Sequence, residues 1–108
     1  MNITLVNFEY GTKYTIGKMF TNKKSWYIKQ KGKGLPAGVY PVVVDEGIFI
    51  LMDDAQVEIT NNKEGVCVIG KQWAGTDYVG LTTTAYKELL SLINEYMDKG
   101  EVFSISIM

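Results

Sequence analysis

Apolar and polar residues alternate along the first two-thirds of the chain, in short runs that turn residues separate. A period of two is typical of strands with one buried face, and clusters of Gly, Pro, Asn and Asp between such runs favour turns. We therefore predict strands at residues 2–9, 13–20, 25–31, 39–44, 48–52, 56–60 and 66–69.

The connections between these runs are of different kinds. Asp45-Glu46-Gly47 is a hairpin signal, because glycine accepts the positive φ that a tight turn requires. Residues 31–38 contain three glycines and a proline and predict a longer loop. The polar residues 61–65 predict a turn between the last two of these strands.

The period changes to three and four residues near the end of the chain, which predicts one amphipathic helix. Thr83 or Thr84 is the candidate N-cap, and Gly100 fits the left-handed position after the helix. Residues 101–108 alternate again and predict a last strand. The apolar stripe of the helix consists of Ala85, Tyr86, Leu89, Leu90, Ile93 and Met97.

These elements predict a mainly β (α+β) protein. Residues 1–108 form a single domain, a compact antiparallel sheet or barrel of about eight short strands. One C-terminal amphipathic helix packs on it and is followed by the last strand. The first twenty residues contain no continuous apolar core, so we expect no signal peptide.

The composition removes several kinds of chemistry. The chain has no histidine, and all eleven of its positive charges are lysines. Histidine carries protons near neutral pH and is the commonest metal ligand, so Ser/His/Asp and Cys/His catalysis and most transition-metal sites are excluded. Cys67 is the only cysteine, which excludes an intramolecular disulfide and a site with several thiolates. We predict no cofactor and no metal.

The net charge of −1 gives no overall attraction to nucleic acid or to an anionic membrane, but the charges are unevenly distributed. Residues 1–44 hold seven lysines and the single acid Glu9. Trp26 and Tyr27, with lysines around them, are similar to a platform for single-stranded nucleic acid. The lack of arginine, the side chain best suited to phosphate, counts against that function.

Two further candidate chemistries have simpler structural interpretations. Cys67 lies in an apolar run without a histidine, which favours a buried thiol over a nucleophile. Asp45-Glu46 and Asp53-Asp54 could supply paired carboxylates for hydrolysis, but adjacent acids at hairpin tips are usually solvated.

Residues 71–80 form the longest segment without periodicity after the core strands. Trp73 and Tyr78 on this glycine-bracketed segment are typical of a recognition loop. Aromatic side chains that fold back onto the sheet are an equally consistent interpretation.

Four segments together resemble a small family of uncharacterised phage and bacterial proteins, whose fold and motif are similar to those of L,D-transpeptidase catalytic domains. In that family, a Gly-Ile-x-Ile-His-x-Gly-Asn stretch and a Gly-Cys-Ile-x-Val-Gly stretch carry the pair that would form an acyl-enzyme on a cell-wall peptide. The segments are Thr4-Leu5-Val6, the stretch Thr15-Ile16-Gly17-Lys18-Met19-Phe20, the turn Leu35-Pro36-Ala37-Gly38-Val39-Tyr40-Pro41-Val42, and the helix and strand of residues 84–107.

The resemblance implies that both catalytic positions have changed. Residues 57–60 match Ile-x-Ile-His, so Thr60 occupies the histidine position. Residues 65–70 match the second motif, so Val66 occupies the cysteine position of the family. Cys67 follows that position by one residue. In a strand, an offset of one residue points the side chain to the opposite face.

The function implied is that of a non-catalytic, phage-associated binding or structural accessory protein on a degenerate transpeptidase-like scaffold. A virion component and an inhibitor of host defence both remain open, and the location would be the host cytoplasm or the virion. The partner would be a protein or a small ligand held where the family has its active-site cleft, with no role for a membrane. We predict that Thr60, Asn61, Asn62, Trp73, Asp77 and Tyr78 border this surface.

Two alternatives from other functional classes remain. One is an enzyme that acts on peptidoglycan or a small substrate through Cys67 or the carboxylates. The other is a single-stranded nucleic-acid binder that uses the lysine-rich N-terminal strands.

Overall fold

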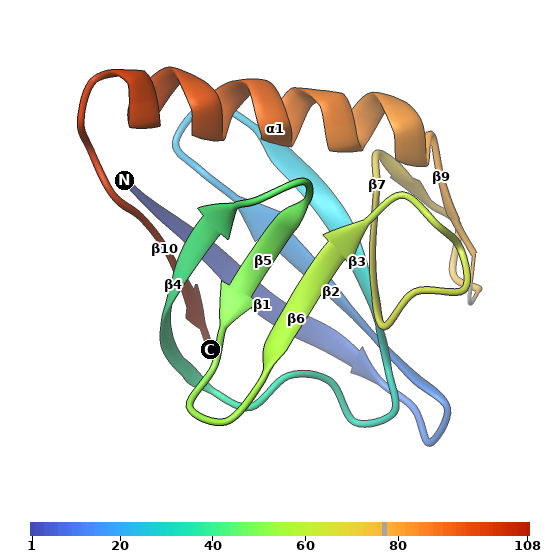
Figure 1. Ribbon diagram of the computed structural model, residues 1–108. Helices are drawn as coiled ribbons and strands as arrows, with labels where there is room; N and C mark the ends of the chain where they lie inside the picture. Colours follow the sequence, from blue (N-terminus) through green and yellow to red (C-terminus); the bar gives the residue numbers. More distant parts are fainter. Residues whose placement is uncertain (77) are drawn as a thin grey trace.

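The computed structural model describes residues 1–76 and 78–108, and eight of its strands close into a barrel (Figure 1). The barrel strands are β1 (Asn2–Tyr10), β2 (Tyr14–Phe20), β3 (Ser25–Lys31), β4 (Gly38–Val44), β5 (Ile48–Leu51), β6 (Gln56–Thr60), β7 (Cys67–Gly70) and β10 (Phe103–Ile107). The helix α1 spans Thr82–Asp98. Around the wall the order is β1, β10, β4, β5, β6, β7, β3, β2. The predicted mainly β domain with one late helix and a last strand is confirmed, and each barrel strand lies within two residues of its expected bounds.

Most neighbouring strands are antiparallel, but two parallel contacts close the ring. β1 lies beside β10, which brings the two ends of the chain together. β6 lies beside β7, with Ile59 opposite Cys67 and Thr60 opposite Val68. Parallel neighbours usually need a crossover of a dozen or more residues. Here only residues 61–66 connect the two strands, so this segment turns back tightly on itself; we call it the 61–66 turn.

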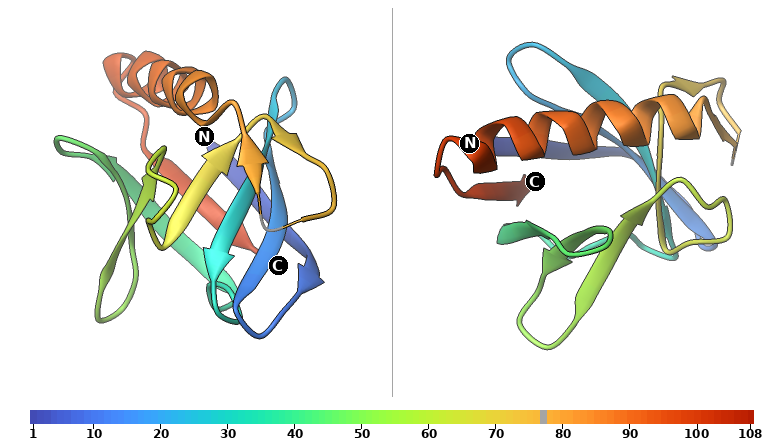
Figure 2. Two further views of the ribbon diagram at one scale, coloured as in Figure 1. Left: turned by 90° about the vertical axis from the view of Figure 1, so that its right-hand side faces the viewer. Right: turned by 45° about the horizontal axis from the view of Figure 1, so that its top comes forward.

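The buried stripe of α1 joins the core of the barrel. α1 packs against β7, β10 and β4, and the left view of Figure 2 looks along the helix where it lies above the strands. Trp26 on β3 is the largest fully buried side chain of this core. Burying one large aliphatic side chain contributes about 1.5–3 kcal/mol, so the shared core accounts for the docking of the helix. The helix contributes Ala85, Leu89 and Ile93.

The two ends of α1 differ in how well the sequence predicted them. The N-cap expected at Thr83 or Thr84 is wrong, because both residues lie inside the helix. Leu81 precedes it in the left-handed conformation (φ 54°), and its carbonyl accepts a hydrogen bond from the Ala85 amide. The C-terminal prediction is confirmed: Gly100 has φ 77°, and its N–H and the next one donate to carbonyls of the last helical turn.

A small polar network fastens the 31–38 loop to the barrel. Gln30 and Thr15 are the buried polar side chains of the described part of the chain. Gln30 Nε2 donates to Asn7 Oδ1 at 2.7 Å, and its Oε1 accepts from the Leu35 amide at 2.9 Å. The Thr15 hydroxyl donates to the Gly32 carbonyl at 2.9 Å. Buried polar groups need such partners, so the loop is held as part of the fold.

Two short strands, before and after the undescribed residue 77, form a hairpin that the sequence pattern does not predict. Its strands are β8 (Gln72–Trp73) and β9 (Val79–Gly80), which pair with each other. The hairpin covers the outer side of the barrel, where Val79 packs with Ile16 and Val68 in a second apolar cluster. Strands of two residues are too short to show any alternation, which explains why sequence periodicity misses them.

Candidate functional site

Residues Thr60, Asn61 and Asn62 open the 61–66 turn, and part of their hydrogen-bonding capacity shapes it. The Thr60 hydroxyl accepts from the Asn62 amide at 3.0 Å, and Asn62 Oδ1 accepts from the Glu64 amide at 3.1 Å. The Gly65 amide donates to the Asn62 carbonyl at 2.9 Å. Asn61 and Asn62 are exposed and Thr60 is half-buried. The turn therefore presents a fixed polar edge at the end of β6.

The two positions that the resemblance matches to a catalytic pair line one groove. Thr60 and Val66 both border a depression of about 310 Å³ between β6 and the 61–66 turn. We call it the β6 groove. Val66 offers an exposed apolar surface there, while Glu58 and Glu64 add acidic groups. Its lining residues are Gln56, Val57, Glu58, Thr60, Glu64, Gly65 and Val66.

Cys67 faces the other side of the barrel wall. Its side chain is 1% exposed and belongs to the main core, whereas Val66 is 51% exposed. Burial raises the pKa of the Cys67 thiol to about 12. The thiolate is the reactive form, so a buried thiol with this pKa is chemically inert at neutral pH. The predicted core cysteine is confirmed.

The two aromatic residues of the hairpin, Trp73 and Tyr78, lie in different surroundings. Trp73 is half-buried, with its ring centroid 5.1 Å from that of Phe8 and 6.0 Å from that of Tyr27, and its Nε1 donates to the Thr76 carbonyl. A bulge in β1 accompanies this contact, since the register with β2 shifts between Asn7 and Glu9. Of the two interpretations of this segment, folding back is therefore correct for Trp73.

Tyr78 remains 54% exposed and faces the 61–66 turn. Lys63 Nζ lies 4.4 Å from the centroid of its ring and 3.3 Å from its hydroxyl oxygen. The structure thus brings Tyr78 next to the turn that carries Thr60, Asn61 and Asn62. Trp73 lies apart from them with Phe8 and Tyr27, and the predicted site residue Asp77 lies outside the described residues.

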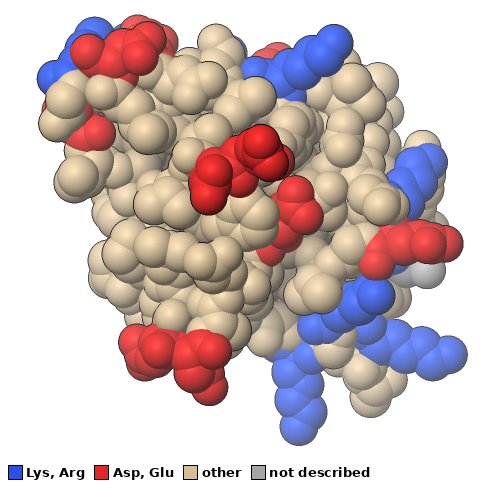
Figure 3. Space-filling model, in the orientation of Figure 1, with Lys and Arg blue, Asp and Glu red and all other residues tan. Residues whose placement is uncertain are grey.

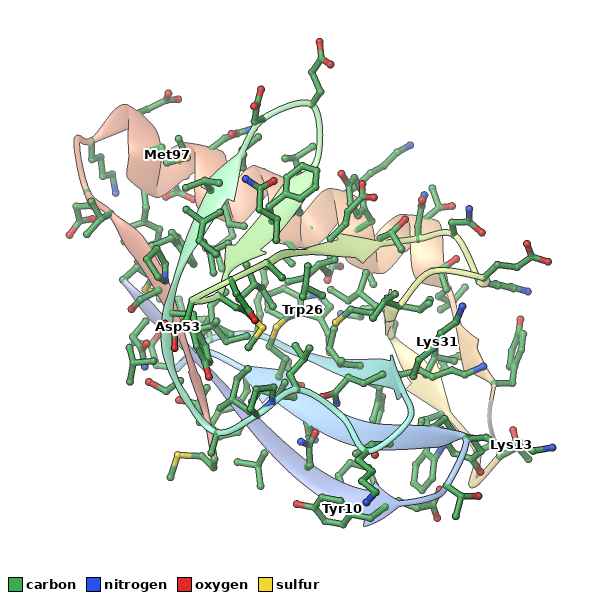
Figure 4. All side chains as sticks on the ribbon, turned by 60° about the horizontal axis from the view of Figure 1, so that its bottom comes forward. Tyr10, Lys13, Trp26, Lys31, Asp53 and Met97 are labelled. Carbon is green, nitrogen blue, oxygen red and sulfur yellow. The ribbon has the colours of Figure 1, made fainter. Side chains whose placement is uncertain are left out.

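A second groove lies on the opposite side of the same turn, and no sequence pattern predicts it. It has a volume of about 230 Å³ and shares Gly65 with the β6 groove. We call it the lysine groove. Lysine side chains gather at the lower right of Figure 3, and Figure 4 shows Lys13 and Lys31 at one end of the barrel, away from Asp53. The residues that line it are Lys13, Tyr14, Lys29, Lys31, Lys63 and Gly65.

The aromatic platform expected from Trp26 and Tyr27 does not form, because strand neighbours face opposite sides. Trp26 points into the barrel (Figure 4), where its indole Nε1 donates to Glu88 Oε1 at 3.1 Å. Tyr27 faces outward, with Lys18 Nζ 5.6 Å from its ring centroid. Only one of the two side chains is thus available at the surface.

The carboxylate pairs remain at exposed tips, far from a common site. Asp45 and Glu46 lie between β4 and β5, and Asp53 and Asp54 lie between β5 and β6. Within residues 1–76 and 78–108, no three His, Cys, Asp or Glu side chains come together as metal ligands. In the same ranges no helix has the length and apolarity needed to cross a membrane.

Comparison of the chain with protein-family models, with curated proteins and with solved structures finds no match. The relationship to the transpeptidase-like family therefore stays a prediction. The geometry of the two grooves is what a functional proposal has to rest on.

Proposed function

We propose that this chain is a non-catalytic binding protein whose recognition surface is the β6 groove. The observation that carries the proposal is the shared location of Thr60 and Val66, which were matched to two separate motifs of the family and border one groove. A hydroxyl and an isopropyl group there offer contact and hydrogen bonding in place of the imidazole and thiol that the family's acyl transfer would need. The nearby thiol of Cys67 faces the core.

The transpeptidase-like ancestry is part of the same proposal. A cleft that once held a histidine and a cysteine becomes a binding groove when a threonine and a valine replace them. The phage association, and with it a location in the virion or the host cytoplasm, follows from this ancestry and is proposed with it.

The β6 groove favours a protein segment or small ligand with mixed chemistry. Its volume is at the lower end of the roughly 300–1,000 Å³ that is usual for ligand sites. Val66 supplies apolar contact, and Glu58 and Glu64 suit a basic group on the partner. The exposed amides Asn61 and Asn62 extend the polar rim toward Tyr78.

The test is site-specific photocrosslinking with p-benzoylphenylalanine in place of Val66, in a lysate of the host bacterium. The matched control carries the same group in place of Val39, which is also an exposed valine but lies on β4. We expect one discrete adduct from position 66 that the substitution Q56W suppresses, because Gln56 lies on the exposed face of β6 and lines the groove. Equal patterns from both positions, or an adduct that Q56W leaves unchanged, would contradict the proposal.

A further inference from the structure

We propose that the lysine groove binds the backbone phosphates of single-stranded nucleic acid. This site is distinct from the β6 groove, since the 61–66 turn separates the two. The inference rests on how the fold gathers charge and aromatic surface from segments that lie far apart in the sequence.

Four lysines converge on this groove from three parts of the chain. Lys13 precedes β2, Lys29 and Lys31 lie on β3, and Lys63 comes from the 61–66 turn. Within the described ranges, none of the four lies within 4 Å of a carboxylate oxygen. Their charges are therefore not neutralised by direct ion pairs there and are available to an anion.

Alternation along β3 explains why these lysines share one face. Lys29 and Lys31 are two residues apart, so both point outward, and Tyr14 of β2 lies opposite Lys31. Trp26, Ile28 and Gln30 of the same strand point inward and are buried. The lysines are thus fixed by a strand whose other face is core, which lowers the entropy lost on binding compared with lysines on a mobile loop.

Two tyrosine rings accompany the lysines. Lys29 Nζ lies 5.9 Å from the ring centroid of Tyr14, and Lys63 Nζ lies 4.4 Å from that of Tyr78. A positively charged groove with aromatic rings at its edge is the arrangement that single-strand binders use, because phosphates follow the charges and unpaired bases stack on the rings. Bases inside a duplex are not free to stack in this way, so the rings favour a single strand.

The distribution of acids supports the same ligand. Figure 4 shows Asp53 at the side of the molecule away from Lys13 and Lys31, so its negative charge does not compete with a polyanion at the lysine groove. The exposed Glu64, which follows Lys63 in the chain, lines the β6 groove on the other side of the turn. The missing arginines count against base-specific readout, and binding through phosphates and stacking does not require it.

The test is fluorescence anisotropy with a labelled single strand of about ten nucleotides, titrated at several salt concentrations starting from about 20 mM. Four phosphate contacts give an expected slope of log K against log salt of about −2.8. The variant K31Q/K63Q should reduce the slope to about −1.4 and lower the affinity. The matched control K23Q/K87Q removes the same charge from exposed lysines outside the groove and should leave both values unchanged.

Stacking is tested at Tyr78. We expect Y78F to bind like the wild type and Y78L to lose about fivefold or more in affinity, because only the first keeps the ring. Thermal melts establish that all variants are folded. No binding at low salt, equal losses for the two lysine pairs, or equal affinity for a duplex or for heparin would each overturn the proposal. Substituting Q56W, on the exposed face of β6, fills the β6 groove and should leave this binding intact.

Discussion

Val66 and Cys67 are neighbours in the chain but face opposite sides of the barrel wall, one toward the β6 groove and the other into the core. The register explains the difference, since Cys67 is the first residue of β7 and pairs with Ile59, another core residue. A thiol at position 66 would therefore lie exposed at the surface, whereas the thiol at position 67 is buried and inert.

The core position of Cys67 predicts how its substitutions act on stability. C67A removes one buried sulfur and should lower the free energy of unfolding by about 1 kcal/mol. C67S places a hydroxyl in an apolar site and should cost about 1–3 kcal/mol. Urea denaturation measures both. A neutral C67S would show that the side chain is solvated, contrary to its burial.

Glu88 Oε1 accepts hydrogen bonds from Lys71 Nζ at 2.9 Å and from Trp26 Nε1 at 3.1 Å, and these contacts predict a pH dependence. The hydrogen bond from Lys71 lowers the pKa of Glu88 most, ahead of that from Trp26 and the nearby positive charges, while partial desolvation opposes them. The folded pKa therefore lies below its usual value near 4.5. The stabilisation is complete above that pH and is lost as the pH falls through the lowered value.

The variant E88Q should consequently lose about 1 kcal/mol of stability at neutral pH and match the wild type in strong acid. E95Q is the control, because Glu95 lies exposed on the same helix in a looser pair with Lys99 at 3.7 Å. Denaturant titrations from pH 7 to about pH 2 provide the comparison. Parallel curves for wild type and E88Q would rule out the predicted linkage.

Gln30 should be necessary for anchoring the 31–38 loop. Q30A leaves the Leu35 amide without its acceptor and Asn7 Oδ1 without its donor, which predicts a loss of about 2–3 kcal/mol. The exposed Gln72 gives the control Q72A, expected to stay within about 0.5 kcal/mol of the wild type. Hydrogen exchange should report faster exchange of the Leu35 amide in Q30A, and unchanged protection would refute the anchoring role.

Gly70 permits the close approach of the hairpin of β8 and β9. A Cβ at this position would lie 2.7 Å from the Gly80 carbonyl oxygen and 2.8 Å from Val79 Cβ. G70A should therefore displace the hairpin and reduce the protection of its amides, while the protection of β1 and β2 persists. Equal loss throughout the barrel would show that the hairpin is not a separate layer.

Local pattern was sufficient to predict most of the fold. Each barrel strand is long enough to alternate, and the stripe from Ala85 to Met97 is long enough to define a helix. The parallel closures of β1 on β10 and β6 on β7 depend on contacts between remote residues, which a periodic pattern does not contain. The N-cap at Leu81 was missed because a backbone turn, without a side-chain cap, starts this helix.

The candidate site was predictable only in part. Thr60 and Val66 were identified from the resemblance alone. The lysine groove was missed because Lys63 is separated from Lys31 by three strands, and only the return of the 61–66 turn to β3 brings them together, through the hydrogen bond from the Lys31 amide to the Val66 carbonyl. Sequence pattern left two interpretations open for Trp73, because periodicity shows neither the bulge of β1 nor the contact with Phe8 beside it.

The most direct test of the central claim compares the reaction of two thiols with an electrophilic probe in the native protein at neutral pH. The wild type carries its thiol at Cys67, and the variant V66C/C67A moves it by one residue into the β6 groove. We expect the wild type to react only on unfolding, the moved thiol to react at the rate of an exposed cysteine, and the further substitution T60H to accelerate it. Rapid native labelling of Cys67 would contradict the proposal of a non-catalytic binding protein.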